Sequence, residues 1–280
     1  MRWDRDHFSN NVEDRRGQGP ARAGMGVFGL LPYFARFGWK GIAVFAVLAG
    51  AVSFVGTQDG SQREGTVGSA EEQEMARFVG FVLDDVQATW QRVMPGRYRD
   101  AKLVLFRGAT QSACGLGQSQ MGPFYCPADQ KVYIDLVFYR DLHERFGAPG
   151  DFAQAYVIGH EIGHHVQHLL GTTGKVHKAP EYLQKGAEGL SVKLELQADC
   201  YAGVWAHDAQ KRNLLEAGDV DEALAAAAAI GDDRLQKQSQ GHVTPETWSH
   251  GSAAQRAFWF KRGLEAGKPA VCDTFAEAAR

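Results

Sequence analysis

The sequence predicts an α+β domain that is mostly helical, carries a small β-sheet and is preceded by one transmembrane helix. Three observations support this fold class: a long uncharged run near residue 50, three short strand-like runs between residues 102 and 136, and helical periodicity over most of the rest. The 280 residues are 44% hydrophobic, enough to bury a core, so a disordered chain is excluded. The chain has a formal net charge of −3 and therefore lacks the excess of basic residues that is typical of nucleic-acid-binding proteins. No nucleic-acid partner is expected.

Residues 37–57 are predicted to cross a membrane once. Gly41–Gly56 contains no charged side chain, and with its neighbours the run reaches the roughly 20 residues that a bilayer requires. The alternatives are a buried core helix and a cleaved signal peptide. The run has no polar face, which disfavours the first, and about forty residues precede it, which disfavours the second.

The charges that flank this run orient it. Arg22, Arg36 and Lys40 lie before the run, whereas only Arg63 follows it within about twenty residues. The positive-inside rule then places the N-terminus in the cytoplasm and residues 58–280 outside.

The regions on either side of the run differ in composition. Residues 1–36 are charged and aperiodic and predict a flexible cytoplasmic tail, with a short apolar patch at Gly24–Phe34 that Pro32 interrupts and that suits the membrane interface. Residues 58–69 are rich in Gly, Ser and Gln and predict a linker. Residues 70–280 form the predicted domain.

The predicted domain begins with a helix over Ala70–Met94, whose apolar residues recur every three or four positions until Pro95-Gly96 ends it. Strands are then predicted at Lys102–Phe106, near Phe124–Tyr125 and at Lys131–Leu136. The rest of the domain is predicted to be helical, over residues 137–146, 151–170, 181–211, 219–240 and 251–266.

His160-Glu161-x-x-His164 is the zinc-binding pattern that defines a zincin-like domain. Residues four apart on a helix differ by about 40° in direction, so the two imidazoles can reach one metal ion. Glu161 lies about 100° round from His160, where a carboxylate can reach a water molecule at the metal without being a ligand. The pattern therefore predicts two metal ligands and a general base.

The remaining faces of the same helix support this interpretation. An apolar stripe nearly opposite the two histidines predicts a face anchored in the core, formed by Ala155, Ile158, Ile162, Val166 and Leu169. Gly159 and Gly163 lie on a third edge, where a neighbouring helix can approach closely.

Two histidines do not complete a catalytic zinc site, which usually has three protein ligands. Glu195 and Asp199 lie four residues apart on another predicted helix that is otherwise largely apolar, where carboxylates are costly unless they are paired or bind metal. We assign Glu195 to the metal and Asp199 to the far ring nitrogen of one histidine. The exchange of these two roles stays open.

His250 is a further candidate catalytic residue. It precedes a helix start rich in small residues, and from there an imidazole can donate a hydrogen bond to the oxyanion that forms in peptide hydrolysis. A structural role at the helix entry is an equal alternative, and Tyr201 is another candidate for the oxyanion.

The chain contains four cysteines and no Cys-x-x-Cys pattern, which disfavours a cysteine zinc site. Cys114 and Cys126 are twelve residues apart between predicted strands and suit a local bridge, which would leave Cys200 to pair with Cys272. Three pairings are possible, and disulfides would fit an oxidising compartment. Four reduced thiols in a cytoplasmic domain are the alternative.

Over nearly its full length the chain resembles the YpfJ-like bacterial family of neutral zinc metallopeptidases. The resemblance implies a membrane-anchored zinc peptidase of the gluzincin type, whose third ligand is the Glu of a Glu-x-x-x-Asp pair, here Glu195 with Asp199. It rests on these segments: Met1-Arg-Trp, Asn11–Arg16, the single hydrophobic segment, Gly122–Pro127, Lys131–Asp135, His160–Gln167, Glu195–Gly203, Gly231–Gln236, His250-Gly-Ser, Gln255-Arg256 and Cys272–Phe275.

Motif and resemblance together predict a zinc-dependent metallopeptidase, with one Zn²⁺ per chain and Glu161 as general base, that hydrolyses peptide or protein substrates. The expected location is the bacterial cytoplasmic membrane, with a single pass and an extracytoplasmic catalytic domain. One alternative is a non-catalytic, membrane-tethered binding or assembly protein with a structural metal; Glu161 argues against it, because a structural site has no use for a carboxylate beside a water molecule. A cytoplasmic hydrolase with an apolar core helix at its N-terminus is the other.

Overall fold

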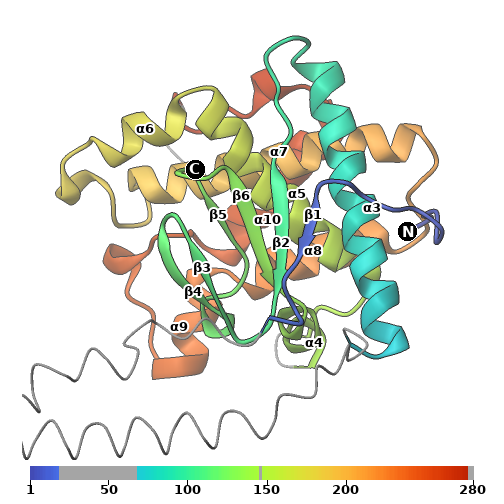
Figure 1. Ribbon diagram of the computed structural model, residues 1–280. Helices are drawn as coiled ribbons and strands as arrows, with labels where there is room; N and C mark the ends of the chain where they lie inside the picture. Colours follow the sequence, from blue (N-terminus) through green and yellow to red (C-terminus); the bar gives the residue numbers. More distant parts are fainter. Residues whose placement is uncertain (19–67, 145–146, 277–280) are drawn as a thin grey trace, which may run out of the picture.

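The computed structural model describes residues 1–18, 68–144 and 147–276, and in it a small sheet packs against a larger set of helices (Figure 1). The first three strands of the sheet run parallel, and the last is antiparallel to its neighbour. In the order in which they lie side by side, the strands are β1 (Val12–Asp14), β2 (Lys102–Phe106), β6 (Lys131–Asp135) and β5 (Phe124–Cys126). A separate antiparallel hairpin consists of β3 (Ala109–Ser112) and β4 (Gly115–Gln118).

Helices form most of the described chain after residue 136. The first helix of the described residues, α3, begins at a capping box in which Ser69 and Glu72 accept hydrogen bonds from each other's backbone N–H groups. The helices are α3 (Ala70–Val93), α4 (Val137–Glu144), α5 (Asp151–Leu169), α6 (Thr172–His177), α7 (Leu190–Lys211), α8 (Asp219–Ala229), α9 (Asp232–Gln240) and α10 (Ala253–Ala266), with short 3₁₀ turns at η2 (Ser119–Met121), η3 (Glu181–Leu183), η4 (Pro245–Thr247) and η5 (Pro269–Val271). The predicted α+β class, mostly helical with a small sheet, is confirmed.

Strand β2 is buried on both faces. Leu103 and Leu105 belong to the main core with the helices, whereas Val104 and Phe106 face a second, smaller cluster with Phe124. The β3–β4 hairpin lies close to this second face: a Cβ at Gly117 would lie 2.6 Å from the Phe124 ring.

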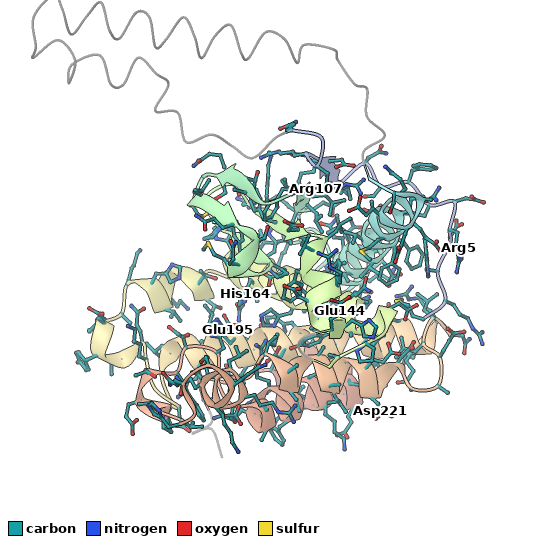
Figure 2. All side chains as sticks on the ribbon, turned by 90° about the horizontal axis from the view of Figure 1, so that it is seen from below. Arg5, Arg107, Glu144, His164, Glu195 and Asp221 are labelled. Atoms are coloured by element: carbon teal, nitrogen blue, oxygen red, sulfur yellow. A yellow bond between two sulfur atoms is a disulfide. The ribbon has the colours of Figure 1, made fainter. Side chains whose placement is uncertain are left out.

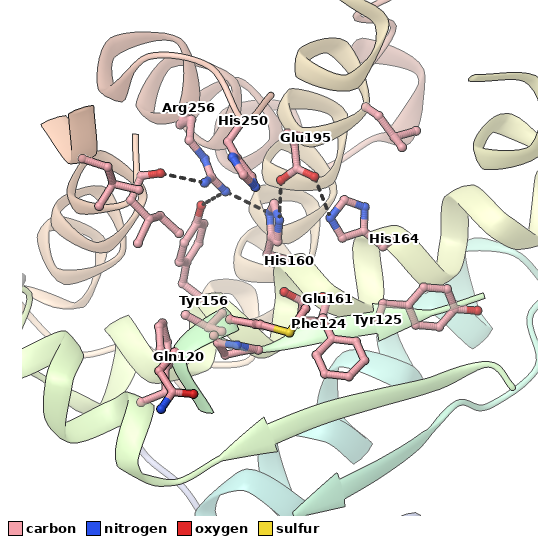
Figure 3. Close-up of a pocket in the computed structure, with 18 of the residues that line it drawn as sticks. Gln120, Phe124, Tyr125, Tyr156, His160, Glu161, His164, Glu195, His250 and Arg256 are labelled. Atoms are coloured by element: carbon pink, nitrogen blue, oxygen red, sulfur yellow. Dashed lines mark hydrogen bonds and ion pairs between the residues drawn. The ribbon is translucent and has the colours of Figure 1, made fainter. Parts of the chain in front are cut away.

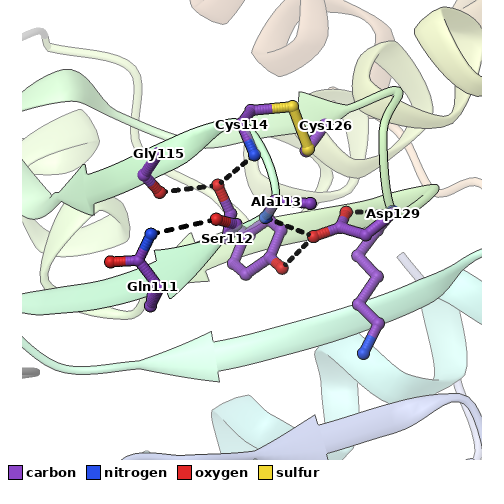
Figure 4. Close-up of a disulfide and its surroundings, with 9 residues drawn as sticks. Gln111, Ser112, Ala113, Cys114, Gly115, Cys126 and Asp129 are labelled. Atoms are coloured by element: carbon purple, nitrogen blue, oxygen red, sulfur yellow. Dashed lines mark hydrogen bonds between the residues drawn. A yellow bond between two sulfur atoms is a disulfide. The ribbon is translucent and has the colours of Figure 1, made fainter.

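A disulfide between Cys114 and Cys126 fastens the hairpin to the edge strand β5 (Figure 4). Beside it, Asp129 accepts hydrogen bonds from Ala113 N (2.9 Å) and from the Tyr133 hydroxyl (2.7 Å). The second disulfide joins Cys200 on α7 to Cys272. Both bridges follow the pairing that spacing favoured.

Close contact between α5 and α7 fixes the part of the fold that carries the candidate ligands. A Cβ at Gly163 would lie 2.9 Å from the Ala198 carbonyl oxygen, and one at Gly159 would lie 3.1 Å from the Trp205 ring. Only a residue without a side chain permits this separation, so the prediction that a helix packs on this edge is confirmed. The α7–α10 contact is closer still: a Cβ at Gly263 would lie 2.0 Å from the Cys200 carbonyl oxygen.

Several predicted helix boundaries were wrong. The helix expected over 181–211 begins only at Leu190, because Gly186 adopts a φ of +104° and Gly189 lies where a Cβ would be 2.4 Å from the Gln184 carbonyl oxygen. The helix expected over 219–240 is two helices, since Gly231 packs against the start of α10. Strands β1, β3 and β4 and helix α6 were not predicted.

The prediction of a flexible tail is wrong for residues 1–18. They lie on the domain, and Val12–Asp14 forms the edge strand β1. The local pattern of apolar and polar residues did not predict this strand, because two of its three residues carry carboxylates. The strand is stabilised by its pairing with β2 rather than by its own β-propensity.

No helix within residues 1–18, 68–144 and 147–276 is long and apolar enough to cross a membrane. The predicted membrane run at residues 37–57, the apolar patch Gly24–Phe34 and residues 58–67 of the predicted linker lie outside the described residues.

Candidate metal centre and active-site cleft

Three candidate ligands converge between α5 and α7. The Nε2 atom of His160 lies 3.2 Å from Glu195 Oε2, and that of His164 lies 3.3 Å from Glu195 Oε1. Each of the three side chains offers one ligand atom, and these three atoms all lie within 4.8 Å of one another. Figure 2 shows His164 and Glu195 where the strand-bearing part of the molecule meets the C-terminal helices. The structure therefore brings together the three side chains that the sequence assigned to the metal.

The opposite ring nitrogen of each histidine has its own acceptor. His160 Nδ1–H donates to Asp199 Oδ1 (2.8 Å), and His164 Nδ1 lies 2.9 Å from Gln167 Oε1. These contacts leave both Nε2 atoms directed at the same point beside Glu195 (Figure 3). Two imidazoles and one carboxylate, with acceptors behind the imidazoles, form a donor set that suits Zn²⁺. In this arrangement Asp199 lies behind His160, as expected, rather than among the ligands.

Asp199 is itself held by a buried cluster. Arg256 on α10 donates to both of its oxygens, from Nε to Oδ2 (2.9 Å) and from Nη2 to Oδ1 (2.9 Å), and the Tyr156 hydroxyl also donates to Oδ1. Arg256 and Asp199 are almost completely buried. A bidentate guanidinium of this kind keeps a buried carboxylate charged and fixes its orientation.

Electrostatic coupling dominates the protonation of the ligand group. Burial lowers the pKa of His160, but the nearby carboxylates of Asp199 and Glu195 outweigh it and raise this pKa to about 10. Glu195 shows the reverse: burial raises its pKa, yet His164 and His160 hold it well below its usual range. The pair of imidazoles and the carboxylate thus stabilise each other's charged forms, and a cation bound between them would replace the protons.

Glu161 lies beside this group without belonging to it. Its side chain is buried on α5 and lines the same cleft as the histidines. Burial raises its pKa, against the opposing effect of His160 and His164. A carboxylate whose pKa lies above its usual value is suited to accept a proton and to return it.

The cleft has a volume of about 920 Å³ and contains all three candidate ligands. Apolar side chains form part of the lining, whereas the candidate ligands, Glu161, His250 and Arg256 supply polar groups. The apolar residues come from different elements: Phe124 from β5, Phe138 from α4, Val157 from α5, Leu194 from α7 and Leu235 from α9.

His250 enters the cleft from the segment before α10, and its side chain is half exposed. Its Nδ1 lies 3.2 Å from Asp232 Oδ1, and the same carboxylate accepts hydrogen bonds from the backbone N–H groups of Ser249, His250 and Gly251. The hydrogen bond to Asp232 raises the pKa of His250, against burial. Both roles considered for His250 are compatible with this geometry, because its backbone is held at the helix entry while its ring faces the cleft.

Tyr201 does not reach the cleft, so its proposed role at the oxyanion is wrong. It points about 120° away from Glu195 round α7, measured by the shorter way. It is buried and packs edge-on against Trp90, with ring centroids 5.1 Å apart. Its direction on the helix follows from its distance of six residues from Glu195, about 240° round the axis.

Four residues of the site were not assigned a role from the sequence: Tyr156, Gln167, Asp232 and Arg256. Tyr156 and Gln167 carried a usable signal, because they lie four residues before His160 and three after His164 on the ligand-bearing side of α5. Asp232 and Arg256 lie in segments that carried the family resemblance, but no helical spacing linked them to the histidines, because they reach the site from α9 and α10 through tertiary packing.

Comparison with known proteins identifies relatives that cover between 70% and 99% of the chain. The protein YpfJ of Escherichia coli (strain K12) is 47% identical over 293 residues, which cover 99% of this chain and 100% of that protein. The protein Rv2575 of Mycobacterium tuberculosis (strain ATCC 25618 / H37Rv) is 46% identical over 206 residues, which cover 70% of this chain and 69% of that protein. No solved structure matches the chain.

The model of one protein family matches residues 1–275, and its description is "Putative neutral zinc metallopeptidase". The match includes residues 1–18, the sheet and every helix that contributes to the cleft. The chain therefore belongs to this family of neutral zinc metallopeptidases, as its resemblance in sequence had implied.

Proposed function

We propose that the protein is a zinc-dependent peptidase that cleaves peptide bonds in the open cleft between the sheet and α7. The observation that carries this proposal is the convergence of His160, His164 and Glu195 on one point, with Glu161 beside them and outside the ligand group. A site built only for structure would not need a second carboxylate beside its ligands in an accessible cleft.

His160, His164 and Glu195 would hold a single Zn²⁺ ion. When bound, zinc would lower the pKa of the attacking water molecule and polarise the scissile carbonyl group. Glu161 takes the proton from the attacking water molecule and delivers it to the leaving amine. His250, held by Asp232, donates a hydrogen bond to the oxygen that becomes negative at the scissile carbonyl. The apolar lining residues Phe124, Phe138, Val157 and Leu235 would accommodate apolar side chains of an extended peptide.

The test of this function uses the full chain, because residues 1–18 are part of the fold. Purified protein is incubated with an unfolded protein substrate before chelation, after chelation and after zinc is restored. Cleavage that disappears with the metal and returns with it supports the peptidase. Stoichiometric zinc without cleavage across varied substrates would support the alternative, a binding or assembly protein with a structural metal.

We further propose that the apolar residues 37–57 attach the protein to the bacterial cytoplasmic membrane and that the catalytic domain lies on its outer side. The uncharged run in the sequence and the two disulfides support this location, because disulfides persist in oxidising compartments. Membrane fractionation together with thiol titration under denaturing conditions tests both statements.

Zinc binding should release between one and two protons at pH 6. The raised pKa values of His160 and His164 mean that both imidazoles are largely protonated without metal, and zinc binds only the neutral form. Zinc affinity should therefore fall as the pH decreases. Calorimetric titration with zinc in buffers of different ionisation enthalpy counts the protons, and a count near zero would contradict the assigned ligands.

The alkaline limb of the pH profile of kcat/KM should belong to His250. Its ring can donate a hydrogen bond into the cleft while also donating to Asp232 only when it is protonated, and Asp232 raises its pKa. Activity should thus be lost as the pH rises through this pKa. Asp232→Asn removes the negative charge and should move the limb to lower pH, whereas His250→Gln should remove it; an unchanged limb in both variants would exclude this role.

A further inference from the structure

The N-terminal arm, defined here as residues 1–18, is joined to the sheet by backbone hydrogen bonds. Strand β1 pairs in parallel with β2 over three residues, from Val12 opposite Leu103 to Asp14 opposite Leu105. Leu103 N donates to Asn11 O (2.8 Å), and Arg15 N donates to Leu105 O (2.8 Å). The arm therefore supplies an edge strand of the same sheet whose other edge lines the cleft.

Side chains of the arm also pack on α3. The carboxylate of Asp84 accepts hydrogen bonds from Ser9 Oγ (2.9 Å) and Asn11 Nδ2 (3.0 Å). Trp3 packs edge-on against Phe78, with ring centroids 5.4 Å apart. These contacts span the arm from its first turn to β1, so the whole arm is part of the domain.

The C-terminal end of the arm lies beside the first turn of α3. Arg16 is buried, forms a salt bridge with Asp14 and donates from Nη1 to the Glu72 carbonyl oxygen in the first turn of α3 (3.0 Å). Glu72 also bonds the backbone N–H of Ser69, the N-cap of that helix. The end of the arm thus lies close to the start of the next described segment, which begins at residue 68.

This neighbourhood restricts how the chain can meet a membrane. A single crossing by residues 37–57 would place the arm and the domain on opposite sides of a hydrocarbon layer about 30 Å thick. Sheet hydrogen bonds of about 3 Å cannot bridge that distance. The expected arrangement, with a cytoplasmic N-terminus and an outer domain, is therefore incompatible with β1.

We propose that residues 1–18 and the rest of the described domain, residues 68–144 and 147–276, face the same compartment. The inference concerns the contacts of the arm and does not depend on peptidase activity. It assigns the membrane partner to one side of the domain, nearest Arg16 and the start of α3.

Site-directed thiol labelling of the full chain in its native membranes tests the proposal. Within the described residues all cysteines are in disulfides, so an introduced thiol is the reactive one. Phe8 in the arm is 78% exposed and Tyr182 in the domain is 81% exposed. Phe8→Cys and Tyr182→Cys are each treated with a membrane-impermeant maleimide in intact spheroplasts and in inverted vesicles.

Both variants should be labelled from the same side, with at least a tenfold preference over the other preparation. Labelling of Phe8→Cys and Tyr182→Cys from opposite sides would overturn the proposal. Asn10→Cys and Val243→Cys, also at exposed positions, form a second pair in case either first variant fails to accumulate. Labelling requires no substrate, so an inactive protein would give the same labelling pattern. The experiment therefore tests the location of residues 1–18 separately from the proposed peptidase activity.

Discussion

Glu161→Gln is expected to lower kcat/KM for peptide hydrolysis by about 10²- to 10⁴-fold and to leave the zinc content unchanged. The amide keeps the shape of the carboxylate but cannot accept a proton from the attacking water molecule. The candidate ligand atoms belong to His160, His164 and Glu195, so the metal should keep all three of these ligands. Steady-state rates on a fluorogenic peptide library and elemental analysis of the same samples measure the two quantities.

Glu265→Gln is the matched control, because it makes the same change at an exposed side chain on α10. It should leave both the rate and the metal content unchanged. A Glu161→Gln protein that cleaved peptides at the rate of the unmodified protein would remove the assigned general base. A loss of zinc in that variant would instead place Glu161 among the ligands.

Arg256→Met is expected to destabilise the metal-free protein by about 3–5 kcal/mol, because it leaves the charge of Asp199 buried without its guanidinium partner. Asp199 also orients His160, so we expect zinc affinity to fall by about 10- to 100-fold. Arg256→Lys keeps the charge but loses the bidentate geometry, and should give an intermediate affinity. Chemical denaturation and competition with a chromophoric chelator measure the two effects separately.

Arg92→Met provides the matched control for this prediction. Arg92 also pairs with an aspartate, Asp208, but its side chain is 52% exposed and lies away from the cleft. Exposed pairs contribute about 1 kcal/mol or less, and zinc affinity should not change. If the two variants had the same stability and the same zinc affinity, Arg256 would have no positioning role.

The motif on α5 could be predicted because its geometry is local. The 40° between His160 and His164 and the apolar stripe behind them follow from helical periodicity alone. Gly159 and Gly163 predicted a close helix neighbour, and α7 occupies that place. The pair Glu195 and Asp199 could be assigned to the same site because two carboxylates on an apolar helix need a partner.

Other parts of the molecule could not be predicted in this way. The start of α7 and the break between α8 and α9 depend on glycines that pack against other segments, and such close approaches are not visible in local periodicity. Strand β1 is short and partly charged, so it is stabilised by β2 rather than by its own propensity. Because nothing in their composition indicates this pairing, residues 1–18 were predicted to be part of a flexible tail.

By itself, the sequence determined the candidate ligands and the candidate general base, because His160 with His164, and Glu195 with Asp199, each lie about one helical turn apart. Only the tertiary structure decided which groups support the ligands and where the N-terminal arm lies. Arg256 is 57 residues from Asp199 along the chain, and β1 is far from β2 in sequence. Contacts at such separations depend on how the whole domain packs, which no local pattern of residues encodes.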